Sequence, residues 1–384
     1  MFESGRVDRR RFVTIAALTL LSGCQMIPPG VREEGPPPPQ ERPSANALPS
    51  DVGRHRVALL VPMSGANSGV GQSIANATTM ALLDTNAQNL RITTYDTSTG
   101  AEAAAARAIA EGNRLILGPL LGEEVAAVSA AARPARVPVI SYSNDHSVAG
   151  HDVFIMGSLP GQSIVRTVSY ARAHGAHTFA ALIPNGTYGQ RASAAFVAAV
   201  REAGGTVAAS ESYDRANTSI VSAAHRLAAR GPFDAVLIAD GGRIAATAAP
   251  LLKSAAPHLL GTELWSGEAI LGTVPALRGA WFSAVPDTRF RQFAESYKSR
   301  FGAQPYRLAT LGYDSVLLTL RVAREWRPGT TFPTERLDDP AGFLGLDGPF
   351  RFLPSGVIER AFEVREVRAG GPVVVSPAPS RFAD

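Results

Sequence analysis

The chain has 384 residues and a nearly balanced charge, with 37 lysines and arginines against 33 aspartates and glutamates, or +4 in formal charge. The first 23 residues hold four of the arginines and two of the acids, so the remainder carries a formal charge of +2. A charge this small excludes the basic surface that nucleic-acid binders need. Roughly 330 residues follow the N-terminal region, which suits two cores better than one.

The N-terminal region has the order of an export signal. Basic residues at 9–11 precede an apolar stretch at 12–21, which ends in Leu21-Ser22-Gly23-Cys24. This order marks a processing segment, and about ten apolar residues are too few to span a bilayer. The last four residues resemble the lipobox of bacterial lipoproteins, in which the cysteine is acylated. We expect a signal peptide at 1–23 and a lipid on Cys24. The alternative is a lone buried thiol in an ordinary helix.

Cys24 is also the only cysteine in the sequence. Its acylation would leave no thiol for a disulfide, a nucleophile or a metal site. Residues 8–13 resemble a twin-arginine signal, which implies export after folding. Gln25 follows Cys24, and the absence of aspartate there resembles outer-membrane sorting. We therefore expect a lipid-anchored protein of the cell envelope that faces the periplasm, at the outer rather than the inner membrane.

Residues 24–54 are rich in proline and predict a tether. Prolines at 28–29, 36–39 and 43 cannot continue a helix or join a sheet, and they favour extended polyproline II structure. At about 3.1 Å per residue the tether could hold the folded part up to roughly 80 Å from the membrane. The alternative is a flexible, inert spacer.

From residue 57 the chain alternates apolar runs of strand length with segments of helical periodicity. The first series predicts strands at 57–61, 90–95, 115–117 and 137–140, and helices at 75–84, 101–111 and 123–132. The second series predicts strands at 179–183, 206–213 and 235–239, and helices at 192–203 and 220–229. Such alternation is typical of βαβ units with parallel sheets covered on both faces.

The two series open alike. Residues 55–62 and 177–184 begin with histidine, contain an apolar run and end in proline, and a Gly-Gln pair follows each at 71–72 and 189–190. A repeat this long indicates two domains of one architecture. Helices at 290–301 and 308–324 follow, and alternation up to residue 364 predicts a hairpin that turns at 354–356.

A family resemblance rests on four segments, at 59–65 (Leu-Leu-Val-Pro-Met-Ser-Gly), 116–119 (Ile-Leu-Gly-Pro), 137–141 (Val-Pro-Val-Ile-Ser) and 347–350 (Asp-Gly-Pro-Phe). Over residues 55–367 the chain resembles type I periplasmic binding proteins of the leucine/isoleucine/valine class. Within that class it is most similar to the domain of lipoprotein activators of penicillin-binding proteins. The resemblance implies an α/β fold with two Rossmann-like lobes of parallel sheets, the Venus-flytrap architecture.

The lobes expected from this resemblance are discontinuous. The first would comprise residues 55–158 and 286–342, and the second residues 159–285 and 343–367, with a tail at 368–384. A ligand cleft would lie between them, because open α/β sheets bind ligands at the carboxyl ends of their strands. The candidate cleft residues are Ser64, Gly118, Gly122, Ser141, Ser143, Asn144, Tyr188, Asp240, Glu263 and Trp265.

The resemblance assigns roles to some of these positions. Glu263 aligns with the acid that receives a ligand amino group, and Trp265 could cover a ligand face. Hydroxyls for a ligand carboxylate would come from the loops near Gly122 and after the fourth strand. This sequence departs from the family pattern in both loops, because Glu123 begins the next helix and Asp145 stands where the family has threonine. Each position also has a structural alternative, such as helix-dipole compensation, turn chemistry or core packing.

Enzyme motifs are absent from the sequence. The glycines at 65–71 are not in the dinucleotide-binding order, and neither a nucleophile elbow nor a zinc-protease motif occurs. We expect no cofactor and no metal. Two functions remain: docking on a peptidoglycan synthase (a penicillin-binding protein), as the activators do, or service as the receptor of an ABC importer, which binds a small polar solute such as an amino acid and delivers it to a permease.

Overall fold

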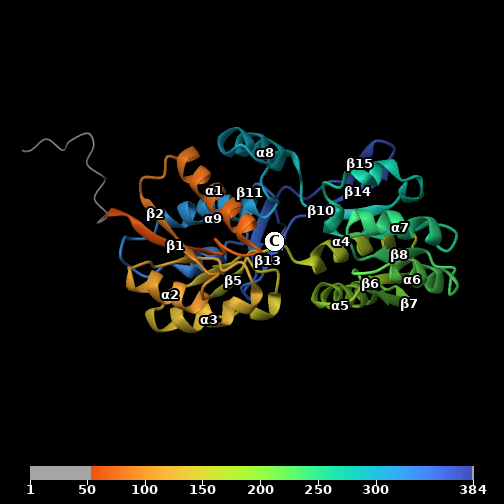
Figure 1. Ribbon diagram of the computed structural model, residues 1–384, viewed down its shortest axis with the longest axis horizontal. Coiled ribbons are helices and arrows are strands. Elements are labelled where there is room, and N and C mark those ends of the chain that lie inside the picture. The colour runs from red at the N-terminus through yellow and green to blue at the C-terminus, as the bar shows by residue number, and fades with distance from the viewer. Residues whose placement is uncertain (1–52, 383–384) are drawn as a thin grey trace, which may run out of the picture. The chain divides into compact units, whose positions relative to one another are not determined.

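The computed structural model describes residues 53–382. The predicted signal peptide, Cys24 and nearly all of the tether lie outside the described residues. Within 53–382, no helix combines the length and apolar character needed to cross a membrane. The described chain forms two lobes, each built around its own sheet with helices on both faces (Figure 1).

The first lobe contains a five-stranded sheet in the order β2-β1-β3-β4-β5, in which all neighbours are parallel. Its strands are β1 (His55–Val61), β2 (Leu90–Asp96), β3 (Ile116–Leu117), β4 (Val139–Ser141) and β5 (Val153–Ile155). Helices α1 (Ser68–Asp84) and α9 (Ala309–Ala323) cover one face, and α2 (Ala101–Ala110) and α3 (Gly122–Ala132) cover the other (Figure 1). Val57 and Leu59 of β1 pack toward the first pair of helices, and Ala58 and Leu60 toward the second. Burial on both faces explains the continuous apolar run.

The second lobe contains a seven-stranded sheet in the order β15-β14-β10-β9-β8-β6-β7. Its parallel strands are β6 (Thr178–Pro184), β7 (Thr206–Tyr213), β8 (Ala235–Ile238), β9 (His258–Gly261) and β10 (Trp281–Ala284). Strands β14 (Glu363–Arg368) and β15 (Gly371–Ser376) extend one edge in antiparallel pairing. Its helices are α4 (Pro160–Ala173), α5 (Thr187–Glu202), α6 (Ser219–Ala228) and α7 (Gly242–Leu252).

Close approach of a helix to a strand end explains the repeated Gly-Gln pair. A Cβ atom on Gly71 would lie 1.8 Å from the Pro62 carbonyl oxygen, and one on Gly189 would lie 1.6 Å from that of Pro184. Only glycine permits this contact, since any side chain would overlap the backbone. The sequence repeat therefore records the same strand-to-helix turn in each lobe.

The lobe boundary near residue 343 differs from the one expected. Strands β11 (Phe343–Gly345), β12 (Gly348–Phe352) and β13 (Ile358–Arg360) form a separate three-stranded sheet. Phe350 and Ile358 of this sheet are buried in the same hydrophobic cluster as β1, α1 and α9. Residues 343–360 thus belong to the first lobe, because their apolar face completes its core. Helix α8 (Thr288–Phe301) packs on α1 in the same lobe.

The hairpin turn at 354–356 is confirmed, because Phe352 pairs with Ile358 across it. Its second strand ends at Arg360, however, and the chain then crosses to the second lobe, where β14 begins. The tail is also partly structural, since β15 pairs with β14. Short 3-10 turns lie at Arg133–Ala135, His146–Val148, Glu263–Trp265, Ala269–Thr273, Pro275–Leu277 and Thr334–Leu337.

Candidate functional site

The loop after β1 is tied to the end of β2. Asp96 accepts hydrogen bonds from the backbone N–H of Met63 at 2.8 Å and of Ser98 at 2.9 Å. The Ser64 hydroxyl donates to the same carboxylate at 3.2 Å. These bonds, led by that from Met63, hold the pKa of Asp96 below its ordinary value. Ser64 therefore lies at the strand ends, as predicted, but its hydroxyl already has a partner.

Two of the candidate glycines serve close packing. A Cβ atom on Gly118 would lie 2.1 Å from the Leu60 carbonyl oxygen, and its φ of +96° is also one that glycine adopts readily. Gly122 begins α3, and a Cβ atom there would lie 2.9 Å from the Ser143 hydroxyl. The loops after β3 and β4 thus pack against each other at the carboxyl edge of the first sheet.

The serines after β4 hold their own loop. Ser141 is completely buried, and its hydroxyl donates to the Pro119 carbonyl at 3.0 Å and accepts from the backbone N–H of Ser143 at 3.1 Å. The Ser143 hydroxyl accepts from the backbone N–H of Asp145 at 3.0 Å. Both hydroxyls therefore have intramolecular partners.

An ion pair joins this loop to the second lobe. The Arg191 guanidinium, on α5, pairs with the Asp145 carboxylate and donates to the Asn144 amide oxygen at 3.0 Å. Burial alone would raise the pKa of Asp145, but hydrogen bonds from Ser147 and the charge of Arg191 bring it below its ordinary value. The two side chains of the pair are 25% and 19% exposed, so solvent screens the interaction only partly. Nothing in the sequence marks Arg191 as a site residue beyond its place just after the Gly-Gln pair.

Glu263 and Tyr188 meet in the second lobe. The Tyr188 hydroxyl donates to Glu263 Oε1 at 3.1 Å, and the Ser163 hydroxyl donates to Oε2 at 2.5 Å. Burial raises the pKa of Glu263 although both hydroxyls favour its charged form. Among residues 53–382 no arginine, lysine or histidine forms an ion pair with Glu263. Ser163 was not among the predicted site residues, because the sequence pattern at 160–173 did not predict the helix on which it lies.

The Asp240 carboxylate, in the same lobe, is bonded to a hydroxyl and to a guanidinium that balances its charge. It accepts from Tyr213 at 2.6 Å and from Arg215 at 2.8 Å. The Trp265 indole N–H donates to the Asp240 carbonyl oxygen at 2.8 Å, and Trp265 is completely buried. Trp265 is therefore a core residue, which corrects the expectation that it could cover a ligand face.

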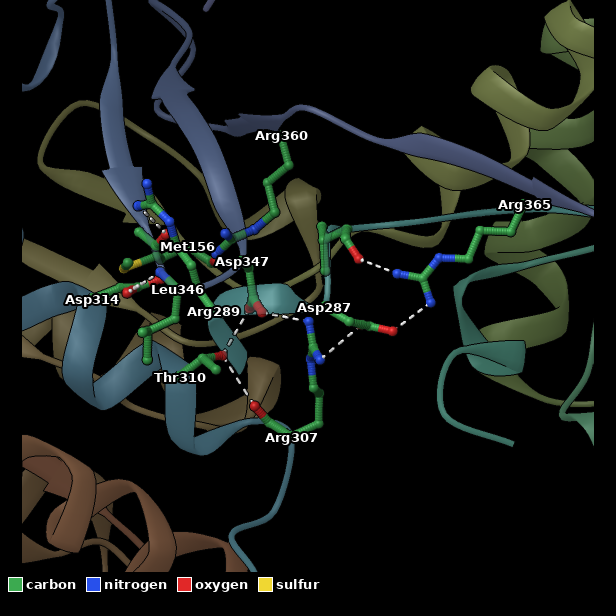
Figure 2. Close-up of polar contacts among 12 residues, drawn as sticks. Met156, Asp287, Arg289, Arg307, Thr310, Asp314, Leu346, Asp347, Arg360 and Arg365 are labelled. Atoms are coloured by element: carbon green, nitrogen blue, oxygen red, sulfur yellow. Dashed lines mark hydrogen bonds and ion pairs between the residues drawn. The ribbon is translucent and has the colours of Figure 1, made fainter. Parts of the chain in front are cut away.

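A charged network surrounds the second crossing between the lobes. Arg307 of the first lobe and Arg365 of β14 reach the Asp287 carboxylate from two sides, at 3.3 Å and 2.5 Å (Figure 2). Arg307 also pairs with Asp347 at 2.6 Å. Burial alone would raise the pKa of Asp287, yet Arg365 and Arg307 hold it below its ordinary value. This network links both lobes at the hinge, which is formed by the three crossings at 156–159, 285–287 and 361–362.

A groove of about 1220 Å³ adjoins the hinge. Its walls come from α4, α5, the end of β13, the crossing at 361–362, and residues 377–379 and 382. Asn144 is the one candidate cleft residue that lines it. The groove is largely apolar, with Val165, Ala195 and Phe362 among its lining residues.

The family model of periplasmic binding proteins matches residues 55–371. The chain belongs to the periplasmic binding protein family. The two lobes of mostly parallel sheets agree with this membership and confirm the predicted fold class. Membership also implies a periplasmic location.

Solved structures show the same fold. A putative branched-chain amino acid ABC transporter protein from Rhodospirillum rubrum is 19% identical with a TM-score of 0.74, covering 84% of this chain and 100% of that one. A substrate-binding protein from Sphaerobacter thermophilus is 20% identical with a TM-score of 0.69, covering 86% and 99%. LivJ from Streptococcus pneumoniae, solved with isoleucine, is 17% identical with a TM-score of 0.61, covering 85% and 100%.

One curated relative matches over a shorter region. The uncharacterized protein RP748 of Rickettsia prowazekii is 29% identical over 139 residues, which are 36% of this chain and 37% of that protein. The chain thus matches little more than a third of the length of this relative. Its name states no activity.

Proposed function

We propose that this protein is the solute receptor of an ABC importer and that it binds a small polar solute with an amino group between its lobes. The observation that carries the proposal is the Glu263 carboxylate, held by Ser163 and Tyr188 without a cationic partner among the described residues. A partly desolvated carboxylate gains most from a charged donor, and a ligand ammonium supplies one. The family and the transporter proteins that share its fold support the same function.

The opposite wall favours amines over simple amino acids. A ligand carboxylate would need a free cation or free hydroxyls there. Arg191, which reaches this wall from the second lobe, is already paired with Asp145, and the Ser141 hydroxyl donates to the Pro119 carbonyl of the loop after β3. The Ser143 hydroxyl accepts from the Asp145 N–H, so its own O–H can still donate. Glu123 and Glu124 at the start of α3 would repel an anion. The Ser143 O–H and the loop amides are the donors left for a ligand carboxylate, without a free cation, so solutes with a weak or absent acidic group fit better than simple amino acids.

The proposal includes the envelope location predicted from the sequence. The signal pattern and Cys24 support a lipid anchor, and Gln25 supports the outer membrane. Docking on a peptidoglycan synthase was the first function suggested by the sequence. The structural relatives are transporter proteins, so the importer function now has the stronger support.

Thermal unfolding with a panel of amines, amino acids and sugars tests the proposal. A solute at a hundred times its Kd should stabilise the folded chain by about 2.7 kcal/mol. Glu263→Gln should weaken an amine about 10- to 100-fold, because it removes the charge and keeps the shape. Glu202→Gln, at the exposed end of α5, is the matched control and should leave affinity unchanged.

Two results would contradict the proposal, the first its importer function and the second its binding site. One is a panel without any stabilising solute together with envelope crosslinking that enriches a peptidoglycan synthase and no permease. The other is a solute whose affinity is the same for Glu263→Gln and for the unaltered protein, which would remove Glu263 from the binding site.

A further inference from the structure

Residues 377–382 make a fourth connection between the lobes. The chain crosses at 156–159, 285–287 and 361–362, and β15 then ends at Ser376 in the second-lobe sheet. Beyond it, Phe382 lies against Arg351 of β12 in the first lobe, with the guanidinium carbon 4.7 Å from the ring centroid. The family match ends at residue 371, so this segment lies outside the part that the family model describes.

The segment is anchored unequally at its two ends. On the second-lobe side, β15 pairs with β14 along its length, and Arg166 donates to the Ser376 hydroxyl at 2.6 Å. On the first-lobe side, the Phe382 ring lies against the Arg351 guanidinium. Arg351 is itself held by Glu359 at 2.7 Å. A single cation–π contact is far weaker than a strand ladder, so Phe382 is the end that releases first.

The length and composition of the segment limit how far it can stretch. Six residues span at most roughly 20 Å when fully extended. Pro377 and Pro379 restrict the backbone to extended conformations, which makes the segment a semi-rigid spacer. While Phe382 stays on Arg351, the lobes cannot separate at this point beyond that length.

We propose that residues 377–382 are an interlobe strap that limits opening of the lobes, with Phe382 as its releasable end. The strap also lines the hinge groove together with α4 and α5. Loss of the strap should let the lobes separate further and more variably. If the proposed solute binding is correct, a less closed receptor also binds its solute more weakly, because only the closed fraction is competent. That consequence rests on the proposed function, whereas the opening itself does not.

Distance measurement between spin labels tests the strap directly. The mature chain with Cys24→Ser has no other cysteine, so Leu83→Cys on α1 and Val197→Cys on α5 give one label per lobe. These side chains are 69% and 50% exposed, which lets both positions accept a label. Phe382→Ala should raise the share of long interlobe distances about two- to fivefold, the range that one cation–π contact supports. A chain that stops after Ser376 should show a larger shift.

Controls separate the strap from a general loosening of the fold. Arg381→Ala alters the exposed neighbour of Phe382 and should leave the distances unchanged. Arg351→Ala removes the same contact from the first-lobe side and should reproduce Phe382→Ala, so the test survives if the shortened chain fails to fold. Superimposable distance distributions for Phe382→Ala, Arg351→Ala and the unaltered chain would overturn the strap, whatever solute the protein binds. An equal shift with Arg381→Ala would also overturn it.

Discussion

Asp314 shows how a single buried acid can make stability depend on pH. Asp314 is 1% exposed, and its Oδ1 accepts from the backbone N–H of Leu346 at 2.8 Å (Figure 2). Burial, with the nearby charge of Asp347, raises the pKa of Asp314 to about 7. The folded protein therefore keeps a proton that the unfolded chain, with an ordinary pKa near 4, releases. The free energy of unfolding contributed by this group must fall as pH rises from about 4 to 7.

Replacing Asp314 by asparagine should flatten that dependence. Asparagine keeps an oxygen for the Leu346 N–H and cannot ionise, so the variant should be more stable than the unaltered protein above pH 7, by roughly 1–2 kcal/mol. Urea unfolding at pH 5 and at pH 8 measures the difference. Asp338→Asn, at an exposed position, is the control and should follow the unaltered protein. Equal slopes for both variants would show that another group controls the pH dependence.

Residue types could be predicted from the sequence more readily than side-chain directions. Glu263 and Tyr188 lie in different loops, and the structure brings their oxygens within 3.1 Å. Ser141 lies at the predicted strand end, but its hydroxyl donates to Pro119 in the loop after β3. Trp265 lies in the core beside Asp240. A loop position follows from strand order, whereas the direction of a side chain depends on packing that one sequence does not reveal.

Most elements with a continuous apolar run or a helical period were predicted, including the short strands β3 and β4, whereas strands β5, β9 and β10 and helices α4 and α7 were not. Strands β5, β9 and β10 have only three or four residues each, too few to show a pattern. Helix α4 mixes serine, threonine, glutamine and arginine with its apolar positions. Its burial against β10 and β14 compensates for the weak pattern. Tertiary packing, rather than the local sequence pattern, therefore determines the secondary structure of these segments.

The ion pair that links α5 to the loop after β4 should contribute measurably to the free energy of unfolding. Arg191 and Asp145 are far apart in sequence and belong to different lobes. Their coupling in a double-mutant cycle with Arg191→Ala and Asp145→Asn should be about 1 kcal/mol and should decrease in 1 M salt, since the pair is only partly buried. Chemical unfolding of the unaltered protein, the two single variants and the double variant measures this coupling energy.

A pair within one helix provides the comparison. Arg107 and Glu111 on α2 form an ion pair whose side chains are 68% and 47% exposed. Its coupling should be smaller than that of the interlobe pair, because water screens it more fully. If the interlobe pair is no stronger than this exposed pair, Arg191 does not hold the lobes together.

At the scale of the whole molecule, the sequence repeat established two lobes, but it could not establish where the returning chain belongs. The alternation near residue 350 looks the same for a strand of either lobe. Phe350 and Ile358 complete the first core, whereas Val364 and Val367 pack in the second. The boundary at Ala361 depends on contacts between segments almost 300 residues apart, such as Phe350 with the cluster around Val57. A local sequence pattern does not reveal such long-range contacts.

The hinge network should therefore control how cooperatively the lobes unfold. Asp287 receives Arg307 from the first lobe and Arg365 from the second, and the Arg365 side chain is only 8% exposed. Asp287→Ala leaves that buried guanidinium with Glu363 as its remaining carboxylate, at 2.7 Å. Losing one partner of a buried pair should destabilise the protein by about 2–4 kcal/mol.

Calorimetry distinguishes a local loss of stability from a loss of coupling between the two lobes. For Asp287→Ala we expect a lower Tm and a van't Hoff enthalpy that falls below the calorimetric one, because the lobes would then unfold in separate steps. Glu325→Ala breaks an exposed pair with Arg336, whose side chains are 53% and 58% exposed, and should cost less than about 1 kcal/mol with a single transition. A transition for Asp287→Ala that is shifted but remains two-state would mean that the core and the other crossings, rather than this carboxylate, couple the lobes.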